Sequence, residues 1–332
     1  MGVSILMPVY NAAPFLAVCL TSILEQSLQD WELIAINDHS SDESKKILLE
    51  FAKNDPRIRV FDNPEKGIIS ALRLALSKSH YSLITRMDAD DKMPTQKLRA
   101  LRKRLLEMPE GSLSTGLVAY FSDGELQDGY RRYAKWLNET ALSNTQYANI
   151  YRECVVPSPC WMMRKSDLIS CGAFDTSRYP EDYDLVFRWY AQQIQIGVVP
   201  EVLHEWRDHA NRSSRTRPEY AQAEYFKLKM PYFLQLDYAT DRPLVLWGAG
   251  KKGKQLAKML LEENIPFHWV CNTPRKWGLQ VYGQLMESYE ILSKLKSPKT
   301  IVAVSGPTDQ VWIESYFQQI GQQAGLDYHF FV

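Results

Sequence analysis

The chain has 332 residues, of which 45% are apolar and 23% charged, a length for which one compact core rarely suffices, so we expect two domains. Its 39 Lys and Arg residues balance its 39 Asp and Glu residues, so no overall positive field favours a nucleic-acid partner. The five cysteines form no Cys-x-x-Cys pair, which argues against a zinc cluster and fits reduced thiols in a cytosol.

The amino-terminal stretch "MGVSILMPVYN" has no basic region and no long apolar core, so it is not expected to be a signal peptide. No apolar run approaches the length of a membrane-spanning helix. We therefore expect a cytoplasmic protein, and peripheral attachment at the inner face of the membrane stays open.

Predicted strands and helices alternate over the first 110 residues. Buried strands are predicted at residues 3–10, 31–38, 57–62 and 81–88. Helices are predicted at residues 14–27, 39–55, 67–79 and 94–108, with Ser40 and Ser41 as candidate caps of the second. This alternation predicts a parallel α/β sheet, whose ligands bind at the carboxyl ends of its strands.

Conspicuous residues follow three of these strands. They are Pro8-Val9-Tyr10-Asn11, Asn37-Asp38 and the acidic cluster Asp88-Ala89-Asp90-Asp91. Neighbouring carboxylates repel one another, and each raises the pKa of the others. A solvated turn before a helix would tolerate such a cluster, but hard oxygen ligands at a strand end are also what Mg²⁺ or Mn²⁺ needs beside a substrate phosphate.

The pattern weakens between about residues 110 and 155, where a polar and aromatic insertion is expected to shape a pocket. A strand at "PCWMMRKSDLI", a helix at "YPEDYDLVFRWYAQQ" and a strand that runs into a polar loop at "IGVVPEVLHEWRDHANRSSR" follow. The predicted domains are 1–215, a helical linker at 216–240, and a smaller α/β domain at 241–332.

The carboxy-terminal domain contains "WGAGKKG" between a predicted strand and a predicted helix. Its glycines, Gly248, Gly250 and Gly253, match a G-x-G-x-x-G phosphate loop. The acid expected after the next strand is absent, since the segment there reads "WVCNTPRKWG". The glycines can therefore bind a phosphate, or they can simply permit tight packing of the strand and helix, and an accessory or assembly role is favoured.

Seven segments, in order, resemble the family 2 inverting glycosyltransferases with the GT-A fold. They are "SILMPVYNAAPFLAVCLTSILEQS", "WELIAINDHSSDES", "EKGIISALRLAL", "RMDADDKMP", "CWMMRKSDLISCGAFD", "EDYDLVFRW" and "WRDHANRSS", and they cover roughly residues 2–215. The resemblance implies a mixed, mostly parallel sheet flanked by helices, with a Rossmann-like domain appended. It also implies sugar transfer from a nucleotide-diphosphate donor, first of all a UDP-sugar, to a saccharide or glycan acceptor in surface polysaccharide assembly.

The resemblance assigns site residues by position in the motifs. Asp182 matches the catalytic base, although Glu181 beside it shares the alternative of a first-turn helix acid. The implied metal ligands for Mn²⁺ or Mg²⁺ are Asp90, Asp88 and His209. The implied nucleotide and donor contacts are Pro8, Val9, Tyr10, Asp38, Lys66, Arg86, Asp88 and Arg207. Lys66 and Arg86 can equally be surface cations and His209 a structural residue, and Asn37, where the family often has Asp, leaves the base open.

Three other functions remain open at this point. An oxidoreductase would use "WGAGKKG", and a phosphohydrolase would use Asp88 as nucleophile and Asp90 as acid. A module that only binds a sugar-nucleotide would need neither the oxidoreductase loop nor a catalytic pair of acids. Turnover of a nucleotide-sugar separates the transferase from all three.

Overall fold

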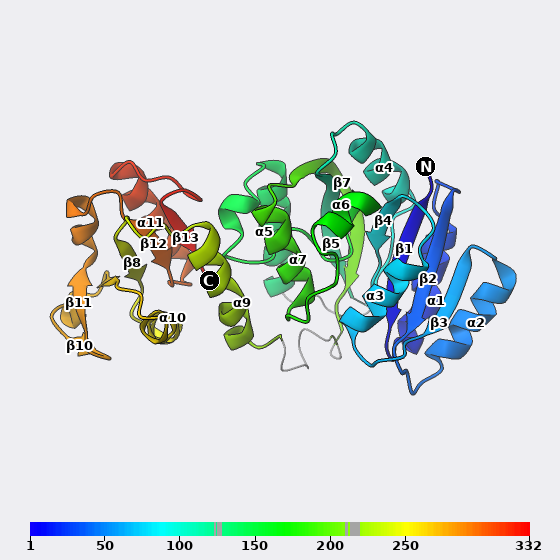
Figure 1. The fold of residues 1–332 in the computed structure, drawn as a ribbon, viewed down its shortest axis with the longest axis horizontal. Helices are drawn as coiled ribbons and strands as arrows, with labels where there is room; N and C mark the ends of the chain where they lie inside the picture. The colour runs from blue at the N-terminus through cyan, green and yellow to red at the C-terminus, as the bar shows by residue number, and fades with distance from the viewer. Residues whose placement is uncertain (123, 125–127, 210–211, 213–219) are drawn as a thin grey trace. The chain divides into compact units, whose positions relative to one another are not determined.

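A computed structural model describes residues 1–122, 124, 128–209, 212 and 220–332. The chain forms two compact units (Figure 1). Unit 1 comprises Met1–Asn144 and Val155–Tyr220, and unit 2 comprises Thr145–Cys154 and Ala221–Val332. The predicted boundary at residue 215 lies outside the described residues. The predicted linker helix is α9 (Gln222–Leu236), which belongs to unit 2.

Unit 1 is built on a seven-stranded sheet with the order β3-β2-β1-β4-β6-β5-β7. The strands are β1 (Val3–Val9), β2 (Trp31–Asn37), β3 (Ile58–Asp62), β4 (Leu83–Arg86), β5 (Ser112–Phe121), β6 (Trp161–Arg164) and β7 (Gln195–Arg207). All neighbours are parallel except β6, which runs antiparallel to both β4 and β5. The mixed, mostly parallel sheet expected from the resemblance is confirmed.

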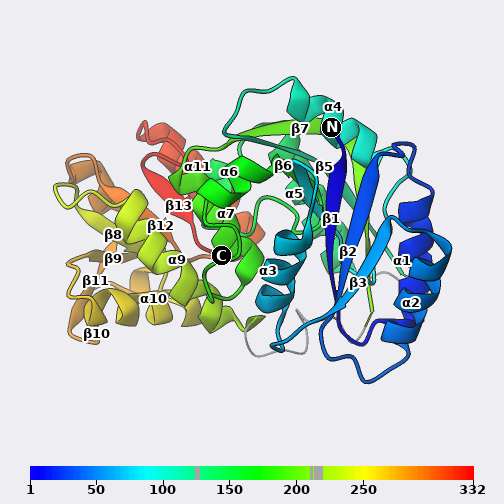
Figure 2. The same ribbon diagram turned by 45° about the vertical axis from the view of Figure 1, so that its right-hand side comes forward.

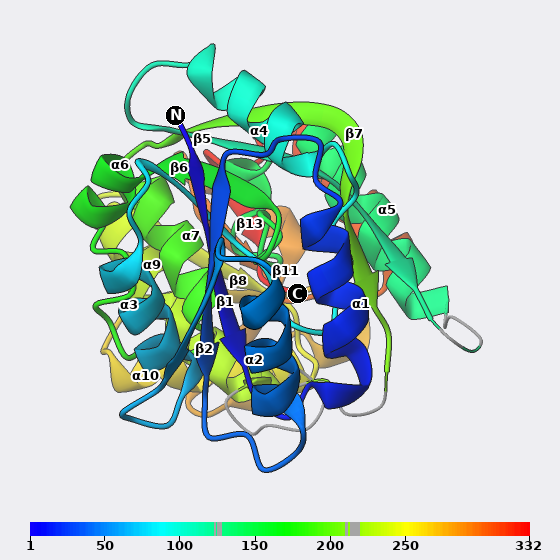
Figure 3. The ribbon, with the colours of Figure 1, turned by 90° about the vertical axis from the view of Figure 1, so that its right-hand side faces the viewer.

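Helices cover both faces of this sheet. They are α1 (Ala13–Leu24), α2 (Ser44–Asn54), α3 (Ile68–Lys78), α4 (Lys97–Leu106), α5 (Asp128–Leu142), α6 (Lys165–Ser170) and α7 (Glu181–Ala191). Helix α3 packs on β1 and β2, and Figure 3 shows it on the opposite side of these strands from α1 and α2. Figure 2 shows β1, β2 and β3 side by side, and β4 pairs with β1 on its other side. The candidate site lies at the carboxyl ends of β1, β2 and β4.

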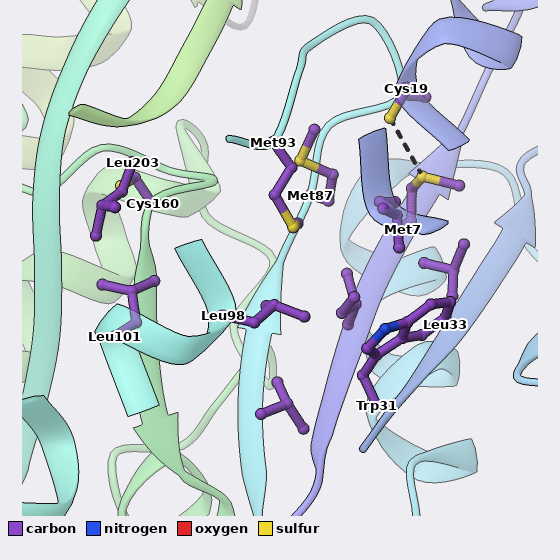
Figure 4. Close-up of a cluster of buried hydrophobic side chains, with 14 of the residues drawn as sticks. Met7, Cys19, Trp31, Leu33, Met87, Met93, Leu98, Leu101, Cys160 and Leu203 are labelled. Carbon is purple, nitrogen blue, oxygen red and sulfur yellow. Dashed lines mark hydrogen bonds between the residues drawn. The ribbon is translucent and has the colours of Figure 1, made fainter. Parts of the chain in front are cut away.

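The core under the site is apolar and closely packed. Met7 of β1 and Cys19 of α1 are fully buried, and their sulfur atoms lie 4.0 Å apart (Figure 4). The Cys19 thiol also donates to the carbonyl of Asp88 at 3.5 Å. The turn that carries the acidic cluster therefore rests directly on this core, which limits its movement.

Strand β5 lies in the region where the sequence pattern is weak. Its first half, "SLST", alternates small hydroxyl residues with little apolar character, yet all four residues are buried. Hydrogen bonds satisfy two of its three hydroxyls, since Ser114 donates to Leu101 O at 2.8 Å and Thr115 to Cys160 O at 2.6 Å. Buried polar groups that are paired in this way leave no hydrophobic period in the sequence.

The predicted caps of α2 are wrong. The helix begins at Ser44, and no side chain caps it. Ser40 and Ser41 instead join the preceding strand end, because the Ser40 hydroxyl accepts from the Asn11 amide at 3.1 Å and the Ser41 amide donates to Asn11 Oδ1 at 2.8 Å. The loop after β2 is thereby tied to the loop after β1.

Unit 2 contains a six-stranded sheet with the order β10-β11-β9-β8-β12-β13. The strands are β8 (Leu244–Trp247), β9 (His268–Cys271), β10 (Gln280–Val281), β11 (Gln284–Ser288), β12 (Lys299–Val302) and β13 (Tyr328–Phe330). Helices α10 (Lys251–Glu262) and α11 (Pro307–Gln319) follow β8 and β12. Short 3₁₀ helices lie at η1 (Tyr147–Asn149), η3 (Pro274–Lys276) and η4 (Tyr289–Lys294). The second α/β unit expected from the sequence is present.

Unit 2 includes Thr145–Cys154, a segment that precedes the rest of the unit in the sequence. The Tyr151 ring stacks on Phe331 with centroids 5.1 Å apart and an interplanar angle of 5°. Its hydroxyl donates to Asp237 Oδ2 at 2.6 Å. Residues 145–154 thus belong to unit 2 because they pack on its core, although they are distant from it in the sequence.

The glycines of "WGAGKKG" differ in what surrounds them. A Cβ on Gly253 would lie 2.0 Å from the carbonyl oxygen of Gly248, and Gly248 itself has φ +142°. A Cβ on Gly250 would meet nothing within 4 Å. The first and third glycines therefore permit the close approach of α10 to the end of β8.

We expect Gly253→Ala to destabilise unit 2 by about 1–3 kcal/mol, because the methyl group forces backbone to shift in a packed site. Gly250→Ala is the matched control and should change the free energy of unfolding by less than about 1 kcal/mol, since its φ of −87° and its open surroundings suit Ala. Urea unfolding of the two variants checks this. Equal stabilities would contradict the packing account.

Candidate active site

The candidate site lies at the carboxyl ends of β1, β2 and β4. In the register of the parallel strands, Val9 pairs with Asn37, and Leu6 pairs with Arg86. The residues after these positions therefore meet at one edge of the sheet, which is where ligands bind in open α/β sheets.

Arg86 holds two carboxylates from different parts of the chain. Its Nε donates to Asp88 Oδ1 at 3.0 Å, and its Nη1 donates to Glu181 Oε1 at 3.0 Å. Burial acts to lower the pKa of Arg86, but the charges of Asp88 and Glu181 outweigh it, and the pKa is raised. The Arg86 side chain is only 6% exposed, so Arg86 is a buried counterion and not a surface cation.

Asp88 remains partly accessible. Its side chain is 26% exposed, and desolvation raises its pKa while the Arg86 charge acts in the opposite direction. Asp88 is thus ion-paired with buried Arg86 and is also accessible from the surface.

Asp90 faces His209, which follows β7. His209 Nε2 lies 2.9 Å from Asp90 Oδ2, and the Asp90 backbone carbonyl accepts a hydrogen bond from Arg207 Nε at 3.0 Å. Burial acts to raise the pKa of Asp90, but the hydrogen bond from His209 and the Arg212 charge outweigh it, and the pKa is lowered. Asp90 therefore stays ionised at neutral pH.

The residues around Asp90 fit a divalent cation. An imidazole nitrogen and a carboxylate oxygen, both ligand groups of divalent metals, face each other here, since His209 Nε2 and Asp90 Oδ2 lie 2.9 Å apart. Mg²⁺ is commonly held by one or two carboxylates together with substrate phosphates. Within the described part of the chain, no three His, Cys, Asp or Glu side chains are grouped to hold an ion by themselves, so a substrate would have to complete such a site.

The end of β2 is internally hydrogen-bonded. Asp38 is 3% exposed, and its Oδ1 accepts from Asn63 Nδ2 at 2.7 Å and from the Gly67 amide at 2.8 Å. Asn37 Nδ2 donates to Asp62 Oδ1 at 2.9 Å. An Asp at position 37 would place two carboxylates in contact, so the Asn found here is explained by its neighbour on β3.

Tyr10 and Lys66 form the exposed part of this edge. Lys66 Nζ lies 4.9 Å from the centre of the Tyr10 ring, a cation–π contact. Tyr10 is 39% exposed. A flat ring with an adjacent ammonium group suits a nucleobase and its phosphates.

Asp182 lies in the first turn of α7, beside a small cavity. The cavity walls include Arg86, Ser158, Asp182 and Trp189. Burial is the largest influence on Asp182, the Glu181 charge is the next, and together they raise its pKa to about 7. A carboxylate with that pKa is suited to accept a proton near neutral pH.

Glu181 is committed to structural bonds, which distinguishes it from Asp182. Its Oε1 accepts from Arg86, and its Oε2 accepts from the Tyr220 hydroxyl at 3.0 Å. Its side chain is 5% exposed. These bonds are consistent with Asp182, the acid that its position in the motif favours, and the assignment stays a prediction.

The structure brings most of the predicted residues into two groups. The first joins Arg86, Asp88, Asp90, Arg207 and His209, and the second joins Tyr10 and Lys66 next to Pro8, Val9 and Asp38. Sequence reasoning missed the roles of Asn63, which follows β3, and of buried Lys97 on α4 and His204 on β7, since a single polar residue gives no periodic signal.

The residues that the structure describes contain no helix that is both long enough and apolar enough to cross a membrane.

Comparison with known proteins identifies a family model and relatives of this chain. Residues 4–172 match the family model described as "Glycosyl transferase family 2". The glycosyltransferase GlyA of Streptococcus pneumoniae is 23% identical over 74% of this chain and 36% of its own length. The O-antigen biosynthesis glycosyltransferase WbnJ of Escherichia coli is 25% identical over 68% of this chain and 87% of its own. The chain thus spans about a third of GlyA and most of WbnJ.

Two solved structures share the fold. S. aureus TarS 1–349 in complex with UDP-GlcNAc matches with a TM-score of 0.55 and 15% identity, covering 72% of this chain and 68% of that one. The mannosyltransferase PcManGT from Pyrobaculum calidifontis, in complex with GDP-Man and Mn²⁺, matches with a TM-score of 0.53 and 19% identity, over 70% and 66%. At these identities the likeness concerns the fold.

Proposed function

The chain belongs to glycosyl transferase family 2, and from this premise we propose that it transfers a sugar, with inversion, from a nucleoside-diphosphate donor to a hydroxyl of a saccharide. The observation that carries the proposal is the Asp88–Arg86–Glu181 ion-pair chain, with bonds of 3.0 Å. It links the acidic cluster after β4 to the residue next to Asp182. The proposed leaving-group site and the proposed base are therefore parts of one network.

In this proposal, Asp182 takes the proton of the acceptor hydroxyl as that oxygen attacks the anomeric carbon and the bond to the diphosphate breaks. Arg207 and Lys66 bind the diphosphate or the donor as charge gathers on it. Tyr10, Val9 and Pro8 hold the base and ribose, together with Asp38. Asp90, Asp88 and His209 would hold Mn²⁺ or Mg²⁺, which would supply Lewis-acid stabilisation of the leaving group.

UDP is the proposed nucleotide and surface polysaccharide assembly the proposed setting. Support comes from the UDP-GlcNAc complex of TarS and from the name of WbnJ, each of which concerns that protein only. PcManGT was solved with GDP-Man, so the fold accepts more than one base.

Release of nucleoside diphosphate from a panel of UDP-, GDP- and dTDP-sugars, with and without Mn²⁺ and with short glycan acceptors, tests the proposal. We expect one UDP-sugar to be consumed with formation of a glycosidic product. Reduction of a nicotinamide cofactor, or release of phosphate from simple monoesters without sugar transfer, would contradict it.

The raised pKa of Asp182 predicts how the transferase activity depends on pH. Its pKa is raised to about 7, and only the ionised form accepts a proton, so activity should rise with pH through 7. At pH 6 about a tenth of the enzyme would carry the ionised base. We expect the log of kcat/KM to fall with unit slope below about pH 7. A profile that is flat between pH 5 and 8 would remove Asp182 as the base.

A further inference from the structure

A buried polar chain stands behind the acidic cluster. Lys97 of α4 donates through Nζ to Pro159 O at 2.6 Å and lies 3.1 Å from His204 Nδ1. On the other side of the ring, His204 Nε2 lies 2.9 Å from Asp91 Oδ2. Lys97 and His204 are 0% exposed and Asp91 is 1% exposed.

The protonation pattern of this chain can be worked out atom by atom. Burial lowers the pKa of Lys97, and the charge of Asp91 acts in the opposite direction. With Lys97 as an ammonium group, which only donates, His204 Nδ1 accepts from it, and the ring carries its proton on Nε2. That proton is donated to Asp91 Oδ2. The other oxygen, Oδ1, accepts the backbone amide of Arg207 at 2.8 Å. Both ring nitrogens of His204 and both carboxylate oxygens of Asp91 thus have a partner, as buried groups require.

Each acid of the cluster consequently has its own basic partner. Asp88 is paired with Arg86, Asp90 with His209, and Asp91 with Lys97 across the His204 ring. The ammonium and the carboxylate of the third pair compensate each other inside the protein. This is why three carboxylates can stand at one strand end without unfolding it.

The acidic turn is also hydrogen-bonded directly to β7. Lys92 and Glu205 exchange backbone hydrogen bonds of 3.0 and 3.1 Å. Arg207 bonds Asp91 through its amide and Asp90 through its side chain. Since His209 follows Arg207 by two residues, a shift of Arg207 relative to Asp91 would move the His209 ring relative to Asp90.

We propose that Asp91, His204 and Lys97 are positioning residues, which hold the acidic turn on β7 and so set the separation of Asp90 and His209. Asp91 is then an anchor and not a ligand of the nucleotide or its cation. The consequence for binding rests on the proposed function, whereas the hydrogen-bond chain itself does not.

Two measurements test the two parts separately. Nitrogen-15 NMR of the histidine rings reports the hydrogen-bond chain. We expect His204 to carry a single proton on Nε2, and we expect Lys97→Met to shift the Nδ1 resonance because that nitrogen loses its donor. A proton on Nδ1 in the wild-type protein would overturn the inference, whether or not the protein binds any nucleotide.

The second measurement is the Mn²⁺ dependence of UDP binding. Lys97→Met leaves Asp91 without its counterion and can fail to fold, so the charge-balanced variant Lys97→Met/Asp91→Asn is measured as well. We expect this variant to fold but to need about 10–100-fold more Mn²⁺ for half-maximal UDP binding, as for other residues that orient metal ligands. Lys103→Met, an exposed change on the same helix, is the control. A folded double variant with the wild-type Mn²⁺ requirement would show that the chain has only a stabilising role.

Discussion

Replacing Asp182 with Asn is expected to lower sugar transfer by about 10²–10⁴-fold, the usual contribution of a general base. The amide keeps the size of the side chain but accepts no proton. UDP affinity should stay within a few-fold of wild type, because the proposed nucleotide contacts come from the ends of β1, β2 and β4. Initial rates of nucleoside-diphosphate release, together with UDP titrations, check both parts.

Asp175→Asn is the matched control for this change. Asp175 is an exposed acid on the segment that leads to α7, so its charge should not affect the rate. If Asp182→Asn transfers sugar as fast as wild type, another group acts as base. If UDP affinity falls as well, Asp182 acts on the donor.

Replacing Arg86 with Met is expected to destabilise unit 1 by about 3–5 kcal/mol. The change removes the shared partner of Asp88 and Glu181, and removing one side of a buried ion pair leaves uncompensated charge in a low-dielectric site. Glu181 is the more affected of the two, since its side chain is 5% exposed against 26% for Asp88. Thermal and urea unfolding measure the loss.

The double variant Arg86→Met/Glu181→Gln should recover part of that stability, because Gln carries no charge to bury. Arg99→Met removes an exposed guanidinium from α4 and should stay within about 0.5 kcal/mol of wild type. An Arg86→Met protein as stable as wild type would mean that Asp88 and Glu181 do not depend on the guanidinium, against the geometry of the site.

Much of the fold could be predicted because the apolar period changes regularly between strand and helix up to β4 and α4. The same pattern also predicted which residues lie at the carboxyl ends of the strands. Strand β5 could not be predicted in the same way, since its buried Ser and Thr residues depend on hydrogen bonds to α4 and to the segment before β6. Those partners are distant in the sequence.

The candidate site shows the same division. The motifs single out Asp90, Asp182 and His209, and they favour Asp182 over Glu181 by position without giving a physical reason. The physical reason comes from Arg86 and Tyr220, which occupy both oxygens of the Glu181 carboxylate. Likewise, the pairing of Asp91 with Lys97 through His204 joins α4, β7 and the turn after β4, and no spacing in the sequence indicates it.

The most direct test of the proposed function is a calorimetric titration of UDP into the protein, first with Mn²⁺ and then with EDTA, for the wild type and for Asp90→Ala. The proposal predicts UDP binding that depends on Mn²⁺ and is greatly weakened in the variant. Binding of GDP or dTDP in place of UDP would retain the transferase and change the donor. No binding of any nucleoside diphosphate would contradict the account and leave the acidic cluster as an internally neutralised turn.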